Sequence, residues 1–445
     1  MLEDKLKELT TRDIYPFHMP GHKRNPAFAF APSPVALDVT ETPDTDDLHH
    51  PTGVLAETMA LAAGLAGSRQ AWLTVGGSTA GLLAGIAACT HRGDTVLVAR
   101  NCHRSVAHAL ALCGVRPVWL VPEWNAALGV YGRLSVETVT ATLREHPDAK
   151  LLILTSPTYE GVVSDIAAMA DAVHAVGATL LVDEAHGAHF GFSPLFPRSA
   201  VTLGADVVVQ SLHKTLPSPT QTGVVHRCSD RVDAEQLAYQ LAVYQTSSPS
   251  YLLLCGADRC LRLLTARRET LFAAYERRLT AFRERVKPWL CPIDGDAGKL
   301  LIPCENGDAL AARLRQEFRI ETEMSGQHHV LAMTSVADTD EGFDRLANAL
   351  ERLRPTASAK RRPPPPPPPQ AMWPCEAADK PYERVSLTEA IGRVAVREVY
   401  AYPPGIPLLL AGETLTDALA AHLLALQAEG VELHGLTDNK IAVVA

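Results

Sequence analysis

The chain of 445 residues carries a formal net charge of −9 at pH 7, with 47% hydrophobic and 20% charged residues. Its length predicts two or three domains, and its acidic balance gives no electrostatic attraction to nucleic acid. We expect no membrane span, because no run of about 18 apolar residues occurs, and no secretory signal at the charged start. The nine cysteines include no CxxC pair, which favours free thiols in the cytoplasm.

The N-terminal arm, residues 1–69, is rich in proline, histidine and acidic residues, and we expect it to be irregular up to about Leu55 and helical after it. In residues 70–285, short apolar runs alternate with amphipathic stretches. This predicts an α/β large domain with a mostly parallel seven-stranded sheet and helices on both faces. We expect strands at 72–75, 95–99, 117–121, 151–154, 179–182, 206–209 and 224–226, and helices at 79–90, 105–112, 136–145, 166–175 and within 231–286.

Three smaller parts complete the chain. Residues 286–358 predict a small α/β domain, with strands near 299–303, 319–323 and 329–334. Residues 359–372 form a linker with seven consecutive prolines, typical of a stiff spacer, with a ligand for an SH3-type domain as the alternative. Residues 373–445 form a short C-terminal module.

The first candidate functional residue is Lys214, in the sequence SLHKT of residues 211–215, directly after an expected strand. Burial favours the neutral form of a lysine, and a neutral amine can form a Schiff base. Ser211 and His213 could donate hydrogen bonds to a phosphate. A lysine after a strand is otherwise most often a solvated surface residue.

The second candidate is Asp183, which ends an apolar strand and begins the sequence DEAHGAH. A carboxylate there can pair with a protonated pyridine nitrogen and keep the ring an electron sink, as pyridoxal 5'-phosphate (PLP) chemistry requires. A helicase box is one alternative, but the chain has no GxxxxGK[ST] loop. His186 and His189 could bind a metal, but no matching ligands accompany them, and we expect none. An Asp in this place can also simply cap a helix.

The third candidate is the sequence GGST of residues 76–79, which follows a strand and opens a helix. A helix N-terminus attracts anions, and Gly77 allows close backbone approach while Ser78 and Thr79 add hydroxyl donors. Phosphate loop, nitrogen-pairing carboxylate and Schiff-base lysine, each at a strand end, resemble in order and spacing the fold type I PLP enzymes, whose large domain is aspartate-aminotransferase-like.

Five further motifs narrow this resemblance to one family. They are HMPGHKR at 18–24, TDDLHHP at 45–51, RNCHRS at 100–105, YQTSSPSY at 244–251 and YPPGIPLLLAGE at 402–413. With them the chain resembles the bacterial ornithine/lysine/arginine decarboxylases. The resemblance implies a PLP enzyme of polyamine biosynthesis that decarboxylates a basic amino acid, working as a homodimer or dimer of dimers with a shared active site.

The resemblance also implies a role for single residues. His103 is expected to stack on the cofactor ring, and Ser247 or Ser248 to reach the cofactor phosphate of a neighbouring subunit. Glu413 is expected near the distal cationic group of the substrate, or else is an acid at a helix start. The remaining expected cofactor contacts are Gly77, Ser78, Thr79, Asp183, Ala185, His186, Ser211, His213 and Lys214.

The chain departs from the family pattern in two respects that matter here. The HMPGH motif begins at residue 18, so we expect no N-terminal wing domain and no decamer. Ala411 stands where the family usually has proline, so the direction of the Glu413 side chain is less well predicted. The alternatives are another fold type I enzyme, such as an aminotransferase with Arg319 as its carboxylate ligand or an aldolase-type lyase, and a catalytically silent relative. The choice among arginine, lysine and ornithine stays open.

Overall fold

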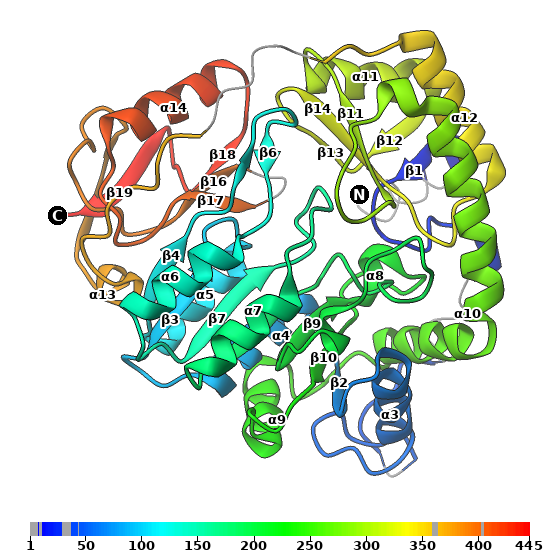
Figure 1. The fold of residues 1–445 in the computed structure, drawn as a ribbon, viewed down its shortest axis with the longest axis horizontal. Helices are drawn as coiled ribbons and strands as arrows, with labels where there is room; N and C mark the ends of the chain where they lie inside the picture. The colour runs from blue at the N-terminus through cyan, green and yellow to red at the C-terminus, as the bar shows by residue number, and fades with distance from the viewer. Residues whose placement is uncertain (1–7, 9–10, 29–36, 43, 358–363, 402–404) are drawn as a thin grey trace.

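The structure is a computed structural model that describes residues 8, 11–28, 37–42, 44–357, 364–401 and 405–445. A large sheet domain occupies the lower half of Figure 1, with the small domain at upper right and the C-terminal module at upper left. Within the described part of the chain, no helix is long and apolar enough to cross a membrane.

The central sheet has seven strands and is parallel except for one of them. The strands are, in sheet order, β2 (Gln70–Thr74), β10 (Gly223–Arg227), β9 (Val207–Ser211), β8 (Thr179–Asp183), β7 (Leu151–Thr155), β3 (Thr95–Ala99) and β4 (Arg116–Leu120). Strand β10 is antiparallel to both neighbours. Only eleven residues, 212–222, connect β9 to β10, and a parallel crossover needs a dozen or more. The mostly parallel sheet is therefore confirmed, with one reversed strand.

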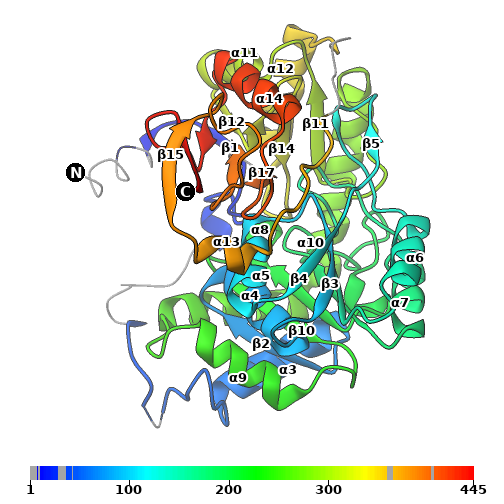
Figure 2. The same cartoon turned by 90° about the vertical axis from the view of Figure 1, so that its left-hand side faces the viewer.

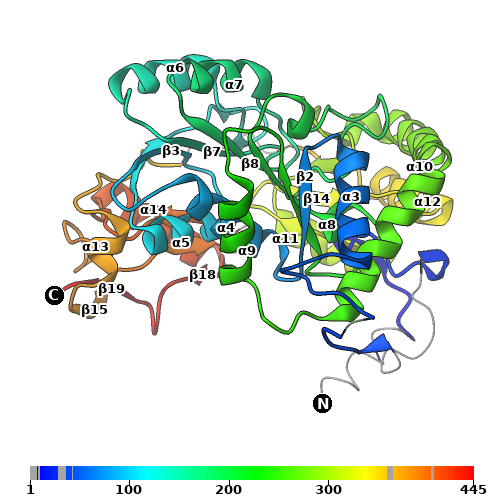
Figure 3. The same cartoon turned by 90° about the horizontal axis from the view of Figure 1, so that it is seen from below.

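Helices cover both faces of this sheet, as the alternating pattern predicts. Figure 3 shows α4 (Gly77–Cys89) and α5 (Arg104–Cys113) on one face, and α6 (Val136–Glu145) and α7 (Ile166–Ala175) on the other. Alternate strand residues supply the two cores: Val96 and Val98 pack on the first side, and Leu97 on the second. Because each strand is buried on both faces, its sequence is continuously apolar.

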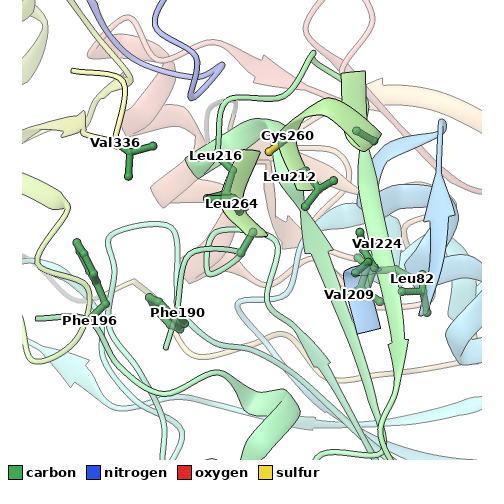
Figure 4. Close-up of a cluster of buried hydrophobic side chains, with 14 of the residues drawn as sticks. Leu82, Phe190, Phe196, Val209, Leu212, Leu216, Val224, Cys260, Leu264 and Val336 are labelled. Atoms are coloured by element: carbon green, nitrogen blue, oxygen red, sulfur yellow. The ribbon is translucent and has the colours of Figure 1, made fainter. Parts of the chain in front are cut away.

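The first of these cores continues toward the long helix α10 (Tyr251–Val286), which leads to the small domain. Figure 4 shows Leu82 and Val209 at one end of this cluster and Cys260 and Leu264 of α10 beside Leu212 and Leu216. Helix α9 (Ala234–Tyr244) packs on α4, and α3 (Val54–Ala66) packs on β2 and α10, as Figure 2 shows for α3 and α9 near the sheet edge. The buried side chains of Leu212 and Leu216 thus anchor the short helix α8 (Leu212–Thr215) on this core.

The small domain contains β11 (Lys299–Pro303), β14 (His329–Met333) and β13 (Met324–Ser325), with helices α11 (Gly307–Phe318) and α12 (Asp340–Leu353). The expected irregularity of the arm before Leu55 is wrong where the arm forms a strand. Strand β1 (Tyr15–Phe17) pairs in parallel with β12 (Ile320–Thr322) of the small domain. A three-residue strand with a proline at its centre shows no alternation, so the sequence gives no signal for it.

The described part of the C-terminal module has two small sheets, one longer helix and one short helix. They are β17 (Ile406–Leu409), β16 (Val399–Ala401) and β18 (Leu433–His434), then β15 (Tyr382–Ser386) with β19 (Lys440–Val444), and helix α14 (Asp417–Ala428). Short helix α13 (Pro374–Ala378) contacts α5 of the large domain. The Tyr-Pro-Pro part of the motif at 402–404, and residues 359–363 of the expected linker, lie outside the described residues.

Candidate active site

A cavity of about 330 Å³ opens at the carboxyl ends of the sheet strands. Ten of the thirteen residues predicted to form the site line it. They are Gly77, Ser78, Thr79, His103, Asp183, Ala185, His186, Ser211, His213 and Lys214. The sequence thus predicts much of the lining of this cavity, because each of these residues lies at the end of a buried strand or shortly after it.

Lys214 is carried by helix α8, directly after β9. Its Nζ lies 3.0 Å from Nε2 of His186. Burial lowers the pKa of the Lys214 ammonium group, while the nearby carboxylates of Asp183 and Glu323 oppose this shift. A lysine amine with a lowered pKa, exposed to a cavity, is a suitable nucleophile for a carbonyl group.

Asp183 is the last residue of β8 and is only 3% exposed. Its Oδ1 accepts a hydrogen bond from the Ala185 N–H at 3.1 Å. Burial raises the pKa of this carboxyl, and the positive charge of Lys214 and the Ala185 bond oppose the rise. A buried carboxyl that lines the cavity is placed to pair with a cationic ring nitrogen.

The hydroxyl groups gather at the start of α4. Ser78 Oγ lies 2.6 Å from Ser211 Oγ, so the loops before α4 and α8 meet there. Gly77 has φ +65°, a conformation that favours glycine, and its N–H donates to the Gln221 carbonyl at 2.8 Å. His213 donates from Nδ1 to the Thr222 carbonyl at 2.8 Å, and burial lowers its pKa to about 4. This end of the cavity offers hydroxyl donors and a helix N-terminus to an anion.

His103 caps helix α5 and also lines the cavity. Its Nδ1 accepts from the Ser105 N–H at 3.2 Å and lies 2.8 Å from the Ser105 hydroxyl, which fixes the ring. Burial lowers the pKa of His103 to about 4, and the charges of Lys214 and Arg104 contribute. The ring is therefore neutral at pH 7 and suited to lie against an aromatic ring.

Three predicted residues lie outside the cavity. Ser247 and Ser248 are exposed in the loop between α9 and α10. Glu413 is fully buried, and its Oε2 lies 3.1 Å from the Arg100 guanidinium. A buried carboxylate needs a partner of opposite charge, and Arg100 provides it, so within this chain Glu413 does not face the cavity.

Further residues, which were not among the thirteen predicted, complete the lining. Met19, Gly76, Asn101, Ser105 and Ile406 lie in motifs noted in the sequence, whereas the others carried no such signal: Leu82, Thr155, Thr158, Tyr159, Thr220, Gln221 and Glu323. Glu323 accepts from the Tyr159 hydroxyl at 2.6 Å and from the Met19 N–H at 2.9 Å. Met19 belongs to the HMPGHKR motif, which could have signalled a place in the site. Glu323 lies in the small domain and gave no such signal.

The alternatives raised by the sequence can be placed on the same structure. Among the described residues, no group of three or more His, Cys, Asp and Glu side chains could hold a metal ion. His189 pairs instead with Asp296 at 3.2 Å. Arg319, the candidate carboxylate ligand of an aminotransferase, has a 63% exposed side chain and pairs with Asp13 at 3.3 Å, and it does not line the cavity.

Comparison with known proteins identifies the family. The family model of the Orn/Lys/Arg decarboxylase major domain matches residues 2–301, and that of the C-terminal domain matches residues 362–440. This chain belongs to the Orn/Lys/Arg decarboxylase family. It is accordingly a PLP-dependent amino-acid decarboxylase of fold type I, and its substrate is a basic amino acid.

Known proteins are similar to this chain over most of its length. The chain is 36% identical to the uncharacterized protein YaaO of Bacillus subtilis, over 91% of this chain and 89% of that one. It is 30% identical to an arginine decarboxylase of Halalkalibacterium halodurans, over 95% and 92%. The constitutive lysine decarboxylase of Escherichia coli has the same fold, with a TM-score of 0.78 and 19% identity over 100% of this chain and 81% of that one.

The cavity fits the cofactor that the family requires. Thr155 Oγ1 is buried at the cavity wall and has no hydrogen-bond partner within the described residues, so a bound group can satisfy it. The cavity also places a lysine, a buried carboxyl and hydroxyl donors on its walls, the three kinds of group that a PLP site needs.

Proposed function

We propose that this enzyme decarboxylates arginine to its amine and carbon dioxide. The observation that carries this proposal is Lys214 in a strand-end cavity with the buried carboxyl of Asp183, within a chain of the Orn/Lys/Arg decarboxylase family. Arginine is favoured over lysine and ornithine because the relatives at 28–30% identity that cover more than nine-tenths of this chain are named arginine decarboxylases.

The residues of the cavity have separate proposed tasks. PLP, when bound, supplies a ring that withdraws electrons from the bond to the carboxylate. Lys214 would supply the amine that holds PLP covalently, and Asp183 would hold a proton at the ring nitrogen of PLP. His103 covers the ring face. The phosphate would be held at the α4 end of the cavity, where Gly77 leaves room and Ser78, Thr79 and Ser211 offer donors. His213 gives its N–H to the Thr222 carbonyl, so it completes the wall with Ala185 and His186.

The charges of the cavity favour a substrate with a cationic side chain. The carboxyl groups of its lining are those of Asp183 and Glu323. With Asp183 assigned to the ring nitrogen, Glu323 can attract a guanidinium or ammonium group. A planar guanidinium favours two parallel hydrogen bonds with a carboxylate, which an ammonium group does not require.

The assembly and the cellular role are also proposals. We infer a homodimer, or a dimer of dimers, in which Ser247 and Ser248 of one subunit reach the cofactor phosphate of the next. Their exposed position outside their own cavity is compatible with this, and light scattering of the purified protein would check it. Nine free cysteines support a place in the reducing cytoplasm, and an amine with a second cationic group suits polyamine biosynthesis.

The decisive experiment incubates the purified enzyme and PLP with arginine, lysine or ornithine, without a keto acid acceptor. Carbon dioxide and amine are measured for each. We expect kcat/KM to be highest for arginine, and Lys214→Ala to lose both turnover and the visible absorbance of lysine-bound cofactor. A higher kcat/KM for another substrate would refute the choice of arginine, and a Lys214→Ala enzyme that keeps both signals would refute the role of Lys214.

A further inference from the structure

A second buried lysine reaches Lys214 through a histidine. Lys299 is the first residue of β11 in the small domain and is 1% exposed. Its Nζ lies 2.7 Å from Nδ1 of His186, and the other nitrogen of that ring, Nε2, lies 3.0 Å from Nζ of Lys214. The roles proposed above leave Lys299 unexplained, because it does not line the cavity.

The surrounding residues hold the Lys299 side chain against His186. Gly161 has φ +105°, and a Cβ atom there would lie 2.7 Å from Lys299 Cγ, so only glycine leaves room for the lysine side chain. The ammonium group lies 5.4 Å from the centroid of the Tyr159 ring, a favourable contact for a cation. The same ring meets His186 edge-on at 4.8 Å and fixes its orientation.

The hydrogen bonds that join Lys214, His186 and Lys299 permit two arrangements of their protons, each with one positive charge. A neutral imidazole carries one N–H and offers one acceptor nitrogen. In the first arrangement, charged Lys214 donates to Nε2 and the Nδ1–H donates to neutral Lys299. In the second, charged Lys299 donates to Nδ1 and the Nε2–H donates to the lone pair of neutral Lys214.

The charges nearby favour a shared proton. Burial lowers the pKa of Lys299 to about 8, and it also lowers the pKa of Lys214. Burial and the two lysines keep the pKa of His186 well below its ordinary value, so the ring stays neutral. Other charged or titratable groups act on each of the three side chains. They are Asp296, Glu160 and Glu323 at Lys299. They are Asp183 and Glu323 at Lys214, and His103 and His213 at His186.

We propose that Lys299 is a positioning residue that accepts, through His186, the proton that Lys214 must lose before it can bond to the cofactor. One N–H bond of Lys214 breaks as Nε2–H forms, while Nδ1–H breaks and an N–H bond of Lys299 forms. The positive charge moves from Lys214 to Lys299, and His186 changes only its tautomer. The proposal rests on the role of Lys214 proposed above.

The test measures how fast Lys214 captures PLP, independently of turnover. Apo-protein is mixed with PLP between pH 6 and pH 9.5, quenched with borohydride, and the labelled Lys214 peptide is measured by mass spectrometry. At pH 7 we expect Lys299→Met to slow labelling about tenfold or more, because the proton then stays on Lys214. As the pH rises, we expect the rates of variant and wild type to converge, since Lys214 then loses its proton to the solvent without the relay.

Two further variants separate the relay from simpler effects. His186→Phe removes both ring nitrogens, and we expect it to slow labelling at pH 7 as Lys299→Met does, with no added loss in the double variant. Lys23→Met is the matched control: Lys23 is also buried, and donates to the carbonyls of His18 and Met333. We expect it to lower stability without changing the pH profile of labelling.

Each contrary result has a distinct meaning. Equal slowing at every pH would make Lys299 a purely structural residue and overturn the relay. An undiminished effect of Lys299→Met in the His186→Phe background would show that the charge acts through space, and would also overturn it. If PLP labels another lysine in the wild type, the proposed role of Lys214 fails as well.

Discussion

At the scale of single residues, Glu413 shows how burial decides between two roles. The sequence places it at the substrate or at a helix start, whereas the structure pairs it with Arg100 at 3.1 Å, with side-chain exposures of 0% and 5%. Arg100 also donates to the Pro407 carbonyl at 2.6 Å, so it links the large domain to the C-terminal module. Such a pair holds two parts of the chain together, and its loss leaves a buried charge without compensation.

We therefore predict that Glu413→Ala lowers the free energy of unfolding by about 3 to 5 kcal/mol. Denaturant unfolding measures this, and KM for the substrate is measured on the same protein. Glu398→Ala is the control: Glu398 pairs with His108 across the same junction, but that pair is partly exposed and its loss should cost at most about 1 kcal/mol. A raised KM with unchanged stability would place Glu413 at the substrate instead.

The residues that the sequence missed share one physical reason. Lys214, Asp183 and Ser78 were found because each lies at the end of an apolar strand or shortly after it, and parallel strands end at one edge of the sheet. Lys299 begins a strand of another domain, 113 positions from His186. Local patterns contain no information on such a pair, and a lysine at a strand start is usually exposed.

At the scale of elements, the HMPGHKR motif acquires a structural meaning. Gly21 lies against the backbone of the turn that carries Lys214, and its N–H donates to the His213 carbonyl at 2.7 Å. A Cβ at residue 21 would lie 2.6 Å from the Leu216 carbonyl oxygen and 2.8 Å from the Leu216 nitrogen. The N-terminal arm thus packs closely on the end of α8 at Gly21, and only glycine permits this close contact.

Gly21→Ala is expected to displace α8 and with it Lys214. We predict about a tenfold weaker affinity for PLP and a loss of about 1 to 3 kcal/mol of stability, the usual cost of overpacking. PLP titration followed by absorbance and denaturant unfolding give the two values. Gly64→Ala serves as control, because no atom lies within 4 Å of its Cβ position in α3 and alanine favours a helix there. Unchanged PLP affinity in Gly21→Ala would contradict this role of the arm.

The elements themselves were largely predictable where burial fixes the pattern. Strand β3 and helices α6 and α7 have the expected bounds, because continuous apolar runs and a 3.6-residue period define them. Strand β4 begins one residue earlier than expected. The direction of β10 and the pairing of β1 with β12 depend on strand partners, and such pairings are set by the tertiary structure.

At the scale of the whole molecule, buried neutral histidines make the fold sensitive to acid. Burial lowers the pKa of His103, His213 and His226 to about 4 each, from an ordinary value of 6.5. Above pH 6.5 such a histidine is neutral in both folded and unfolded chains, and its contribution is constant. Below pH 6.5 the unfolded chain takes up the proton first, so stability falls until the folded pKa is passed.

His226 allows this effect to be measured away from the active site. It is fully enclosed, with Nδ1 3.0 Å from the Ser68 hydroxyl and Nε2 3.2 Å from the Gln210 side-chain oxygen. A shift from 6.5 to about 4 corresponds to about 3 kcal/mol of stability lost between these pH values. We predict that His226→Asn, although less stable at pH 7.5, loses about 3 kcal/mol less than the wild type when the pH falls to 4. Urea unfolding across this range is the measurement. The exposed His91, changed to Asn, should leave the pH dependence as it is, because its side chain is 96% exposed. If His226→Asn keeps the full acid sensitivity, the proton uptake that destabilises the fold occurs at other groups.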